Sequence, residues 1–386
     1  MKKQFYILLL MLGVLFASCI KDELPNSEAD ISGCEIPDMP AKVLDGISIE
    51  NKKVKIWINA DEREGIKTLT LNFSLSDGAT ILPENGTIQN FENTDTVSYT
   101  VTSENGKWKK KYIVEITSFA LLPDEDGNKL FSFGHFEVTK NGKASYHQFY
   151  EWNEETSTKQ YVWSSGNAGF GIVNSAEPPE NYPTSSIPDG KTGNAVKLTT
   201  SSTGSFGEQV KMPIAAGNLF LGTFDILKAM TETLKATNFG MRSKLGEPEL
   251  LRFWYKYQRG AVYKDKDGNV MSKTDNPDIY AVLYEPVIKP DGTVERLDGT
   301  NIKTADNIIA IADLKPADIT YSDNIETAEY SQLSIPFVKR KEINTGKLRN
   351  GAYFITIVFS SSADGSKFEG AVGSTLCIDE VQLICK

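Results

Sequence analysis

The chain has 386 residues, with 51 Asp and Glu against 41 Lys and Arg, and a formal net charge of −10. This acidic balance argues against a nucleic-acid-binding protein and against attachment to anionic lipid through a basic surface, since both need clustered positive charge. A chain of this length predicts two or three domains.

The N-terminal segment is typical of a secretory signal. Lys2 and Lys3 precede an apolar run from Phe5 to Ala17, which is too short to cross a bilayer because a spanning helix needs about 20 residues. A basic start, a short apolar core and small residues before a break characterise cleaved signals. We expect residues 1–18 to be removed, and the loss of the two lysines then changes the net charge from −10 to −12.

The sequence LFASC at residues 15–19 resembles the lipobox of bacterial lipoproteins. The resemblance implies that Cys19 becomes the acylated first residue and anchors the protein in the outer membrane, at about 0.8 kcal/mol per buried CH₂. IKDE at residues 20–23 looks like the acidic stretch that sends lipoproteins of Bacteroidetes-type bacteria to the cell surface. The alternatives are an ordinary cleaved signal with a chance cysteine and a charged linker.

Residues 19–33 are predicted to form a polar tether, and residues 34–118 show the period-two alternation of β-strands. VSYTVT and KKYIVEIT flank an Asn105–Gly106 turn, which is the strongest short-range signal for a hairpin. Several such strands within about 85 residues predict an immunoglobulin-like (Ig-like) β-sandwich. The stretch from LSDGATILPENG to KWKKKYIVEI also resembles small Ig-like repeats of Bacteroidetes surface proteins, which implies a spacer.

Residues 119–129 contain a proline, three acids and a glycine and predict a linker. Residues 130–386 are again rich in predicted strands, at 278–285, 307–314, 330–337 and 351–362. The last of these has apolar residues at both odd and even positions, so we expect a central strand that is buried on both faces. One segment, residues 224–235, has the apolar spacing of a helix.

Both ends of this second domain resemble the jelly-roll fold of carbohydrate-binding modules, through FSFGHFEV at 131–138 and STLCIDEVQLI at 374–384. Between them, three segments resemble a family of gut Bacteroidetes labelled the putative carbohydrate metabolism domain: WSSGNAGF at 163–170, AAGNLFLGTF at 215–224 and LLRFWYKYQRG at 250–260. The expected fold class is therefore all-β, an Ig-like β-sandwich followed by a larger jelly-roll β-sandwich. The resemblance implies glycan handling but supplies no catalytic residues.

No catalytic motif is evident in the sequence. Its two histidines, His135 and His147, have no zinc-binding spacing, and there is no nucleophile elbow, phosphate loop or dinucleotide fingerprint. A glycoside hydrolase needs only two carboxylates about 5 to 10 Å apart, and a sequence with 51 acids nominates no particular pair. Glycan binding is the favoured function, a glycoside hydrolase is the first alternative, and a structural adhesin that contacts protein is the second.

Sugar rings stack on flat aromatic side chains while their hydroxyls bond to a few fixed polar groups. The candidate carbohydrate-binding residues are Trp152, Trp163, Trp254 and Tyr257. Trp254 is preferred because it shares a strand face with Arg252 and Lys256, opposite the face of Tyr257. The alternative for each of the three tryptophans is a place in the core or at its rim. Asn167 and Asn218, which lie beside glycines, are expected to stabilise turns.

A structural calcium ion is the one cofactor that the sequence suggests, and none is required. The first and last strands of a jelly roll lie near one another, so Glu137 and Asp379 are predicted as calcium ligands. The alternative is that Asp379 accepts backbone N–H bonds. The expected partners are a glycan, the outer membrane through Cys19, and proteins of a glycan-uptake system.

Overall fold

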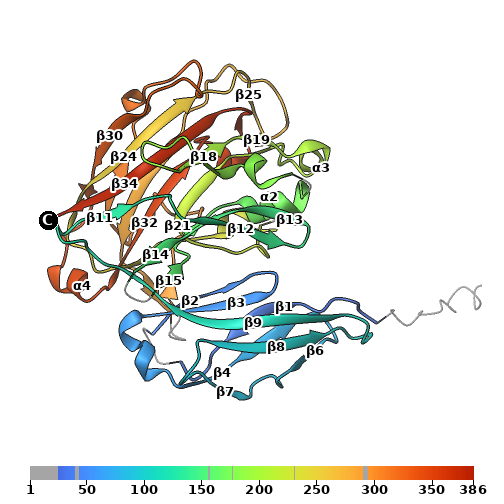
Figure 1. The fold of residues 1–386 in the computed structure, drawn as a ribbon. Helices are drawn as coiled ribbons and strands as arrows, with labels where there is room; N and C mark the ends of the chain where they lie inside the picture. Colours follow the sequence, from blue (N-terminus) through green and yellow to red (C-terminus); the bar gives the residue numbers. More distant parts are fainter. Residues whose placement is uncertain (1–24, 40–42, 155–156, 176, 230, 290–293) are drawn as a thin grey trace, which may run out of the picture.

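The computed structural model describes residues 25–39, 43–154, 157–175, 177–229, 231–289 and 294–386. Two β-sandwiches follow one another along the chain, a small N-terminal one and a larger C-terminal one (Figure 1), and this confirms the predicted all-β class. Within the described ranges, no helix has the length and apolar character needed to cross a membrane. The predicted signal and Cys19 lie outside the described residues.

The small sandwich is an Ig-like arrangement around one apolar core. Its strands are β1 (Ile31–Glu35), β2 (Leu44–Ile49), β3 (Lys53–Ile58), β4 (Thr68–Thr70), β5 (Asn72–Leu75), β6 (Thr80–Leu82), β7 (Ile88–Asn90), β8 (Thr96–Thr102) and β9 (Lys109–Ser118). Five of them form a sheet in the order β2-β3-β9-β8-β6, and the pairs β1–β5 and β4–β7 complete the sandwich. Alternating side chains such as Val54, Leu69 and Phe73 fill the core.

The predicted hairpin is confirmed, because β8 and β9 pair antiparallel with Tyr99 opposite Tyr112. Two domain boundaries differ in detail from the expected ones. Ile31 is buried and β1 pairs with β5, so the sandwich begins inside the predicted tether. Leu121, at the start of the predicted linker, is already part of a strand of the large domain, β10 (Ala120–Leu121).

The large sandwich has two main sheets. The six-stranded sheet contains β11 (Lys129–Phe131), β17 (Thr184–Ile187), β18 (Ala195–Thr199), β24 (Pro248–Gln258), β30 (Ser331–Pro336) and β34 (Thr375–Cys385). The nine-stranded sheet contains β10, β16 (Trp163–Ser164), β21 (Asn218–Phe224), β22 (Thr237–Phe239), β23 (Met241–Ser243), β26 (Asp278–Tyr284), β29 (Ile308–Asp313), β31 (Val338–Lys339) and β32 (Tyr353–Ser360). Their facing side chains form the main core, which includes Phe253, Ile279 and Phe359.

Short strand pairs and helices surround these sheets. The pairs are β12 (Phe136–Asn141) with β13 (Ala144–Phe149), β14 (Glu151–Asn153) with β15 (Thr158–Gln160), β19 (Ser201–Ser202) with β20 (Ile214–Ala215), β25 (Tyr263–Lys264) with β33 (Gly370–Ala371), and β27 (Val287–Ile288) with β28 (Val294–Glu295). The helices are α2 (Asn167–Val173), α3 (Gly204–Gln209) and α4 (Thr345–Arg349).

The strand predictions for the large domain are confirmed, and the helix prediction is wrong. β32 is buried along nearly its whole length and pairs with β26 on one side and with β21 and β23 on the other. The predicted helix at 224–235 is instead the loop of a hairpin, because Phe224 pairs with Thr237 across β21 and β22. Asp225 accepts a bond from the N–H of Leu227 at 3.0 Å, which favours a turn over a helix.

The two sandwiches are joined by buried contacts. Trp57 lies on β3 of the small sandwich, yet it is 5% exposed and packs in the core of the large one. Arg242 of β23 donates to both carboxylate oxygens of Asp45, and the Nε of Arg296 donates to the backbone oxygen of Asp45 at 3.0 Å. Lys244 also pairs with Asp61 at 2.5 Å. These contacts fix the small sandwich against the large one.

Candidate functional site

A groove of about 520 Å³ lies on the outer face of the nine-stranded sheet, which is turned away from the main core. Phe220 of β21, Val358 of β32 and Tyr280 of β26 line it from the sheet. Phe220 pairs with Val358, and Val358 pairs with Tyr280, so the three side chains form one row across adjacent strands. A cavity of this size with an apolar floor is typical of ligand sites.

The period of two in each strand produces this floor. Ile279 and Ala281 are fully buried in the main core, so Tyr280 between them points to the opposite face. Ile357 and Phe359 place Val358 in the same way. A central strand with apolar side chains on both faces therefore serves the core with one face and the groove with the other.

The walls of the groove are loops held by side-chain bonds to the backbone. The Oδ1 of Asn218 accepts from the N–H of Gly166 at 2.8 Å, just before α2. Asn167 is fully buried and both donates to and accepts from the backbone of Thr184, at 2.7 and 3.1 Å. These bonds are not the local turns that were expected for the two asparagines but links between distant segments: Asn167 joins α2 to β17, and Asn218 joins β21 to the residue before α2. They fix the wall that contains α2.

A polar cluster stands at one side of the floor. The Nζ of Lys303 donates to Asp278 Oδ1 at 2.7 Å and to Asp313 Oδ1 at 2.8 Å, and it lies 4.2 Å from the ring centroid of Tyr280. Asp278 and Lys303 both line the groove. They place a carboxylate acceptor and an ammonium donor beside an aromatic floor.

Burial shifts the pKa values in this cluster. It raises the pKa of the Asp278 carboxyl above its ordinary value, although the charge and hydrogen bond of Lys303 act in the opposite direction. Burial alone would lower the pKa of Lys303, but its contacts with Asp278 and Asp313 outweigh that effect and raise it. Lys303 therefore stays protonated at neutral pH and is a fixed positive charge on the groove wall.

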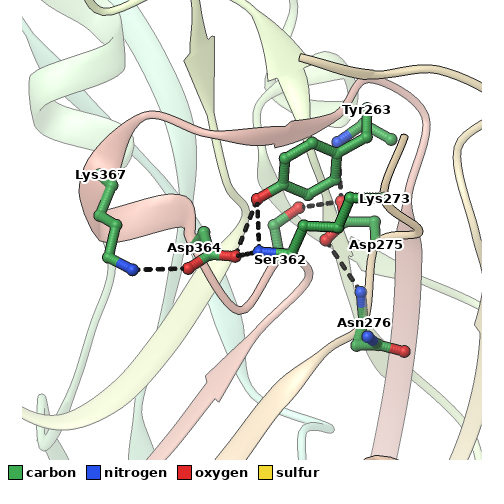
Figure 2. A network of polar contacts seen from close by, with 8 residues as sticks. Tyr263, Lys273, Asp275, Asn276, Ser362, Asp364 and Lys367 are labelled. Atoms are coloured by element: carbon green, nitrogen blue, oxygen red, sulfur yellow. Dashed lines mark hydrogen bonds and ion pairs between the residues drawn. The ribbon is translucent and has the colours of Figure 1, made fainter. Parts of the chain in front are cut away.

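The turn at residues 361–369 forms a second wall of the groove, which Ala363 and Gly365 line. Asp364 lies between these two residues and has three hydrogen-bond partners (Figure 2). The hydroxyl of Tyr263 donates to its Oδ2 at 2.8 Å, Lys367 donates to its Oδ1 at 2.9 Å, and Lys273 donates to its Oδ2. Burial would raise the pKa of Asp364, but these partners lower it to about 2. The turn is thus tied by charge to β25 and the segment that follows it.

Asp275 connects the same turn to β33 and to the start of β34 through hydrogen bonds. It is 2% exposed, and its Oδ2 accepts from the hydroxyls of Ser362 and Ser374 at 2.5 and 2.8 Å and from the N–H of Ala371 at 2.8 Å. Figure 2 shows Asp275 next to Ser362, with Asn276 bonded to its other oxygen. A buried carboxylate with this many donors fixes the backbone of the groove wall.

Phe368 ends the short turn of this wall in the left-handed backbone region, at φ 60°. This conformation is strained for a bulky residue and is concentrated at functional sites. The ring is only half-buried, and it lines the groove together with the half-buried Phe224. These two phenylalanines are the aromatic faces of the groove that a ligand can reach.

The four predicted carbohydrate-binding aromatics are not brought together, and none of them lines this groove. Trp254 is half-buried on the outer face of the other sheet, where the Nζ of Lys191 lies 4.2 Å from its ring centroid. Tyr257 has no exposed surface and donates to the backbone oxygen of Ser361 at 3.0 Å. The fully buried ring of Tyr257 cannot stack on a sugar, so this prediction is corrected.

Trp163 and Trp152 lie at the side of the large sandwich that faces the small one. Trp163 is 1% exposed in the main core, and its indole N–H donates to Glu151 at 3.0 Å. Trp152 is 37% exposed and donates to Glu154 at 3.2 Å. Trp163 therefore has the core position that was its alternative, whereas Trp152 keeps an exposed face.

The two predicted calcium ligands have separate protein partners. Glu137 accepts from Lys159 at 2.5 Å and from Tyr161 at 2.7 Å. Asp379 is 1% exposed and accepts from the backbone N–H groups of Thr192 and Glu380 at 2.9 and 2.8 Å. Asp379 thus accepts backbone N–H bonds, which was the alternative to calcium binding. Among the described residues, no group of three or more His, Cys, Asp or Glu is arranged to hold a metal, and the calcium ion stays a prediction.

Sequence reasoning named two asparagines that line the groove, Asn167 and Asn218, but it did not find the charged pair or Phe368. Asp278 and Lys303 are 25 positions apart, and Phe368 lies in a loop, so no local pattern joins them. A signal existed in Tyr280, because a tyrosine between the core residues of a buried strand must face the other side of the sheet. Without the strand order, that face had no known neighbours.

Comparisons with known proteins identify both sandwiches. A family model described as "Putative carbohydrate metabolism domain" matches residues 135–384, and one described as "SGBP, N-terminal" matches residues 38–116. The chain is similar to a crystal structure described as a putative glycoside hydrolase from Bacteroides thetaiotaomicron, at 37% identity and a TM-score of 0.75, over 95% of this chain and 99% of that one. Another, described as a putative glycoside hydrolase from Bacteroides vulgatus, shows 38% identity and a TM-score of 0.60, over 69% of this chain and 100% of that one. No curated protein matches the chain.

Proposed function

The chain belongs to the family described as the putative carbohydrate metabolism domain, and from this premise we propose that it binds glycan at the bacterial cell surface through the groove of its large sandwich. The match of the small sandwich to the N-terminal domain of SGBP, the surface glycan-binding proteins, supports this function. The small sandwich then acts as a spacer, and proteins of a glycan-uptake system are the expected partners.

One observation carries the proposal, the combination of reachable aromatic faces and charged groups in the groove. Phe224 and Phe368 offer faces to the C–H side of a sugar ring. Asp278 accepts and Lys303 donates on the same wall, as the hydroxyls of a sugar require. The hydrogen-bonded loops around them hold these groups in place before ligand arrives, which lowers the entropic cost of binding.

The proposal predicts that Phe368→Ala weakens glycan binding by about 1 to 3 kcal/mol, the usual cost of a lost aromatic contact at a binding site. A glycan array with the two-domain protein, residues 25–386, identifies a neutral oligosaccharide ligand, and isothermal titration then measures the affinity of each variant for it. Phe206→Ala is the matched control, because Phe206 is 49% exposed and does not line the groove. Equal affinities of the two variants would contradict the groove as the binding site.

A glycoside hydrolase is the second candidate, and it is favoured by the carboxylate of Asp278 in the groove and that of Asp364 in the adjoining turn. The pKa of Asp278 is raised while that of Asp364 is lowered to about 2, and a pair with separated values is the arrangement of a general acid and an ionised partner. The similar solved structures carry the description of putative glycoside hydrolases. Release of reducing sugar that Asp278→Asn abolishes, with binding retained, would establish hydrolysis in place of binding alone.

We also propose that Cys19 carries the lipid that holds the protein on the outer membrane, as its lipobox resemblance implies. Cys19→Ala is expected to move the full-length protein from the membrane fraction to the soluble fraction, because acyl chains supply the only membrane contact in this proposal. Cys34→Ala is the control, since Cys34 is a half-buried thiol of the small sandwich. Retention of the Cys19 variant on membranes at high salt would refute the anchor.

A further inference from the structure

A second cavity, of about 610 Å³, lies between the two sandwiches. Its walls include Lys53, Lys55 and Trp57 from β3 of the small sandwich, and Glu137 and Tyr161 from the large one. The β12–β13 hairpin faces the small sandwich in Figure 1, which shows where the two walls approach each other. We call this cavity the interdomain cleft. Because buried contacts fix the two sandwiches together, its walls are preformed.

The cleft is positively charged in an otherwise acidic protein. Four lysines and two acids line it: Lys52, Lys53, Lys55 and Lys140 against Glu50 and Glu137. The whole chain, in contrast, has a formal net charge of −10. A local excess of positive charge in a hollow with low-dielectric walls attracts anions.

Some of these lysines are engaged and some are available. Lys55 pairs with Glu50 at 2.8 Å, and Lys53 pairs with Glu115 at 3.0 Å. Lys52 and Lys140 are exposed and have no ion pair in the described part of the chain. Two ammonium groups at the mouth of the cleft are therefore free to meet a negatively charged ligand.

A row of aromatic rings leads from the cleft to the surface. Tyr161 lines the cleft, and its ring centroid lies 5.7 Å from that of Tyr150. Tyr150 stacks on His135 at 5.6 Å, and His135 lies 6.4 Å from the exposed Trp152. Tyr150 is covered by His135 and by the Nζ of Lys159 at 4.8 Å, and the Nζ of Lys55 lies 5.2 Å over Tyr161. The exposed Trp152 at the outer end of the row is therefore the ring on which a sugar can stack.

One wall of the cleft also carries an unsatisfied donor. Trp57 is 5% exposed, and its indole N–H has no hydrogen-bond partner in the described residues. A buried polar group without a partner beside a cavity is a common sign of a missing water or ligand. This observation is independent of the charge and of the aromatic row.

We propose that the interdomain cleft is a second glycan site, and that it takes an acidic saccharide whose carboxylate or sulfate groups meet Lys52 and Lys140 while one of its rings stacks on Trp152. This site is separate from the groove of the large sandwich and does not depend on glycan binding there. It also gives the small sandwich a part in recognition beyond that of a spacer, because Lys52 belongs to it.

The test is isothermal titration of the two-domain protein, residues 25–386, with tetragalacturonate and with its methyl-esterified form. The wild type is expected to bind the acid at least fivefold more tightly than the ester, and the preference should shrink as salt is raised. Lys52→Glu/Lys140→Glu should lower the affinity for the acid at least tenfold. A sulfated tetrasaccharide in the same assay separates sulfate from carboxylate recognition.

Lys264→Glu/Lys341→Glu is the matched control, because it makes the same change in net charge at two exposed lysines that do not line the cleft. Trp152→Ala should weaken the acid and the ester by a similar factor, and Phe206→Ala, at an exposed phenylalanine that does not line the cleft, should leave both unchanged. The proposal is overturned if no acidic probe binds, if acid and ester bind equally, or if the cleft and control double variants bind the acid alike.

Discussion

Asp45→Ala is expected to lower the free energy of unfolding by about 3 to 5 kcal/mol, the cost of removing one partner of a buried ion pair. Asp45 is 3% exposed and Arg242 is 7% exposed, and they share two hydrogen bonds between the sandwiches. The variant leaves the Arg242 guanidinium buried without its counter-charge. Denaturant unfolding followed by circular dichroism and by tryptophan fluorescence measures the loss.

Two further variants show whether the buried charge is responsible. Asp45→Leu/Arg242→Met removes both charges and should recover much of the loss, because replacing a buried pair by apolar side chains is often neutral. Glu92→Ala is the surface control. It breaks the Lys67–Glu92 pair, whose side chains are 65% and 49% exposed, and should cost below about 1 kcal/mol. Similar losses for Asp45→Ala and Glu92→Ala would show that the interface is not stabilised by Asp45.

The sequence was most informative where neighbours in the chain are also neighbours in the fold. Tyr99 and Tyr112 flank a tight turn, so alternation and Asn-Gly were sufficient to predict their pairing. The apolar run of β32 predicted a central strand, because a strand with apolar side chains on both faces must be covered on both faces. The apolar spacing near residues 225–236 wrongly predicted a helix, because the pairing of β21 with β22 makes this segment the loop of a hairpin.

The candidate sites could not be predicted because they depend on strand order and on the packing of one sandwich against the other. Trp254 was the preferred sugar-binding residue because the alternation of its strand put it on the face opposite Tyr257. That alternation placed Trp254 correctly on the outer face of its sheet. However, alternation cannot say which of two sheets carries the groove. The floor around Tyr280 follows from the order β21-β32-β26, which the sequence does not encode in any local motif. The cleft depends in the same way on contacts between distant residues, such as the hydrogen bonds between the sandwiches that join residues 183 to 251 positions apart.

Trp57 shows the difference most clearly, and its replacement is the second variant with a large expected effect. The alternation of KVKIWIN assigns Val54, Ile56 and Ile58 to the core of the small sandwich and leaves Trp57 on the outer face. That face is covered by the large sandwich, where Trp57 joins the same core as Phe131 and Trp163. The outward-facing Trp57 is thus an interface residue.

Trp57→Ala is expected to cost about 3 to 5 kcal/mol, because it leaves a large cavity in a core that cannot collapse fully. We also expect the single unfolding transition of the wild type to divide into two, since Trp57 couples the sandwiches and an interface without it no longer transmits unfolding from one to the other. Trp108→Ala is the matched control, because Trp108 is 63% exposed on the small sandwich and its loss should change stability by under about 0.5 kcal/mol. Differential scanning calorimetry on the two variants distinguishes the outcomes. One transition at an unchanged temperature for Trp57→Ala would mean that the sandwiches are not coupled through this side chain. The preformed walls of the cleft would then have to rest on the polar contacts of Asp45 with Arg242 and Arg296 and of Asp61 with Lys244.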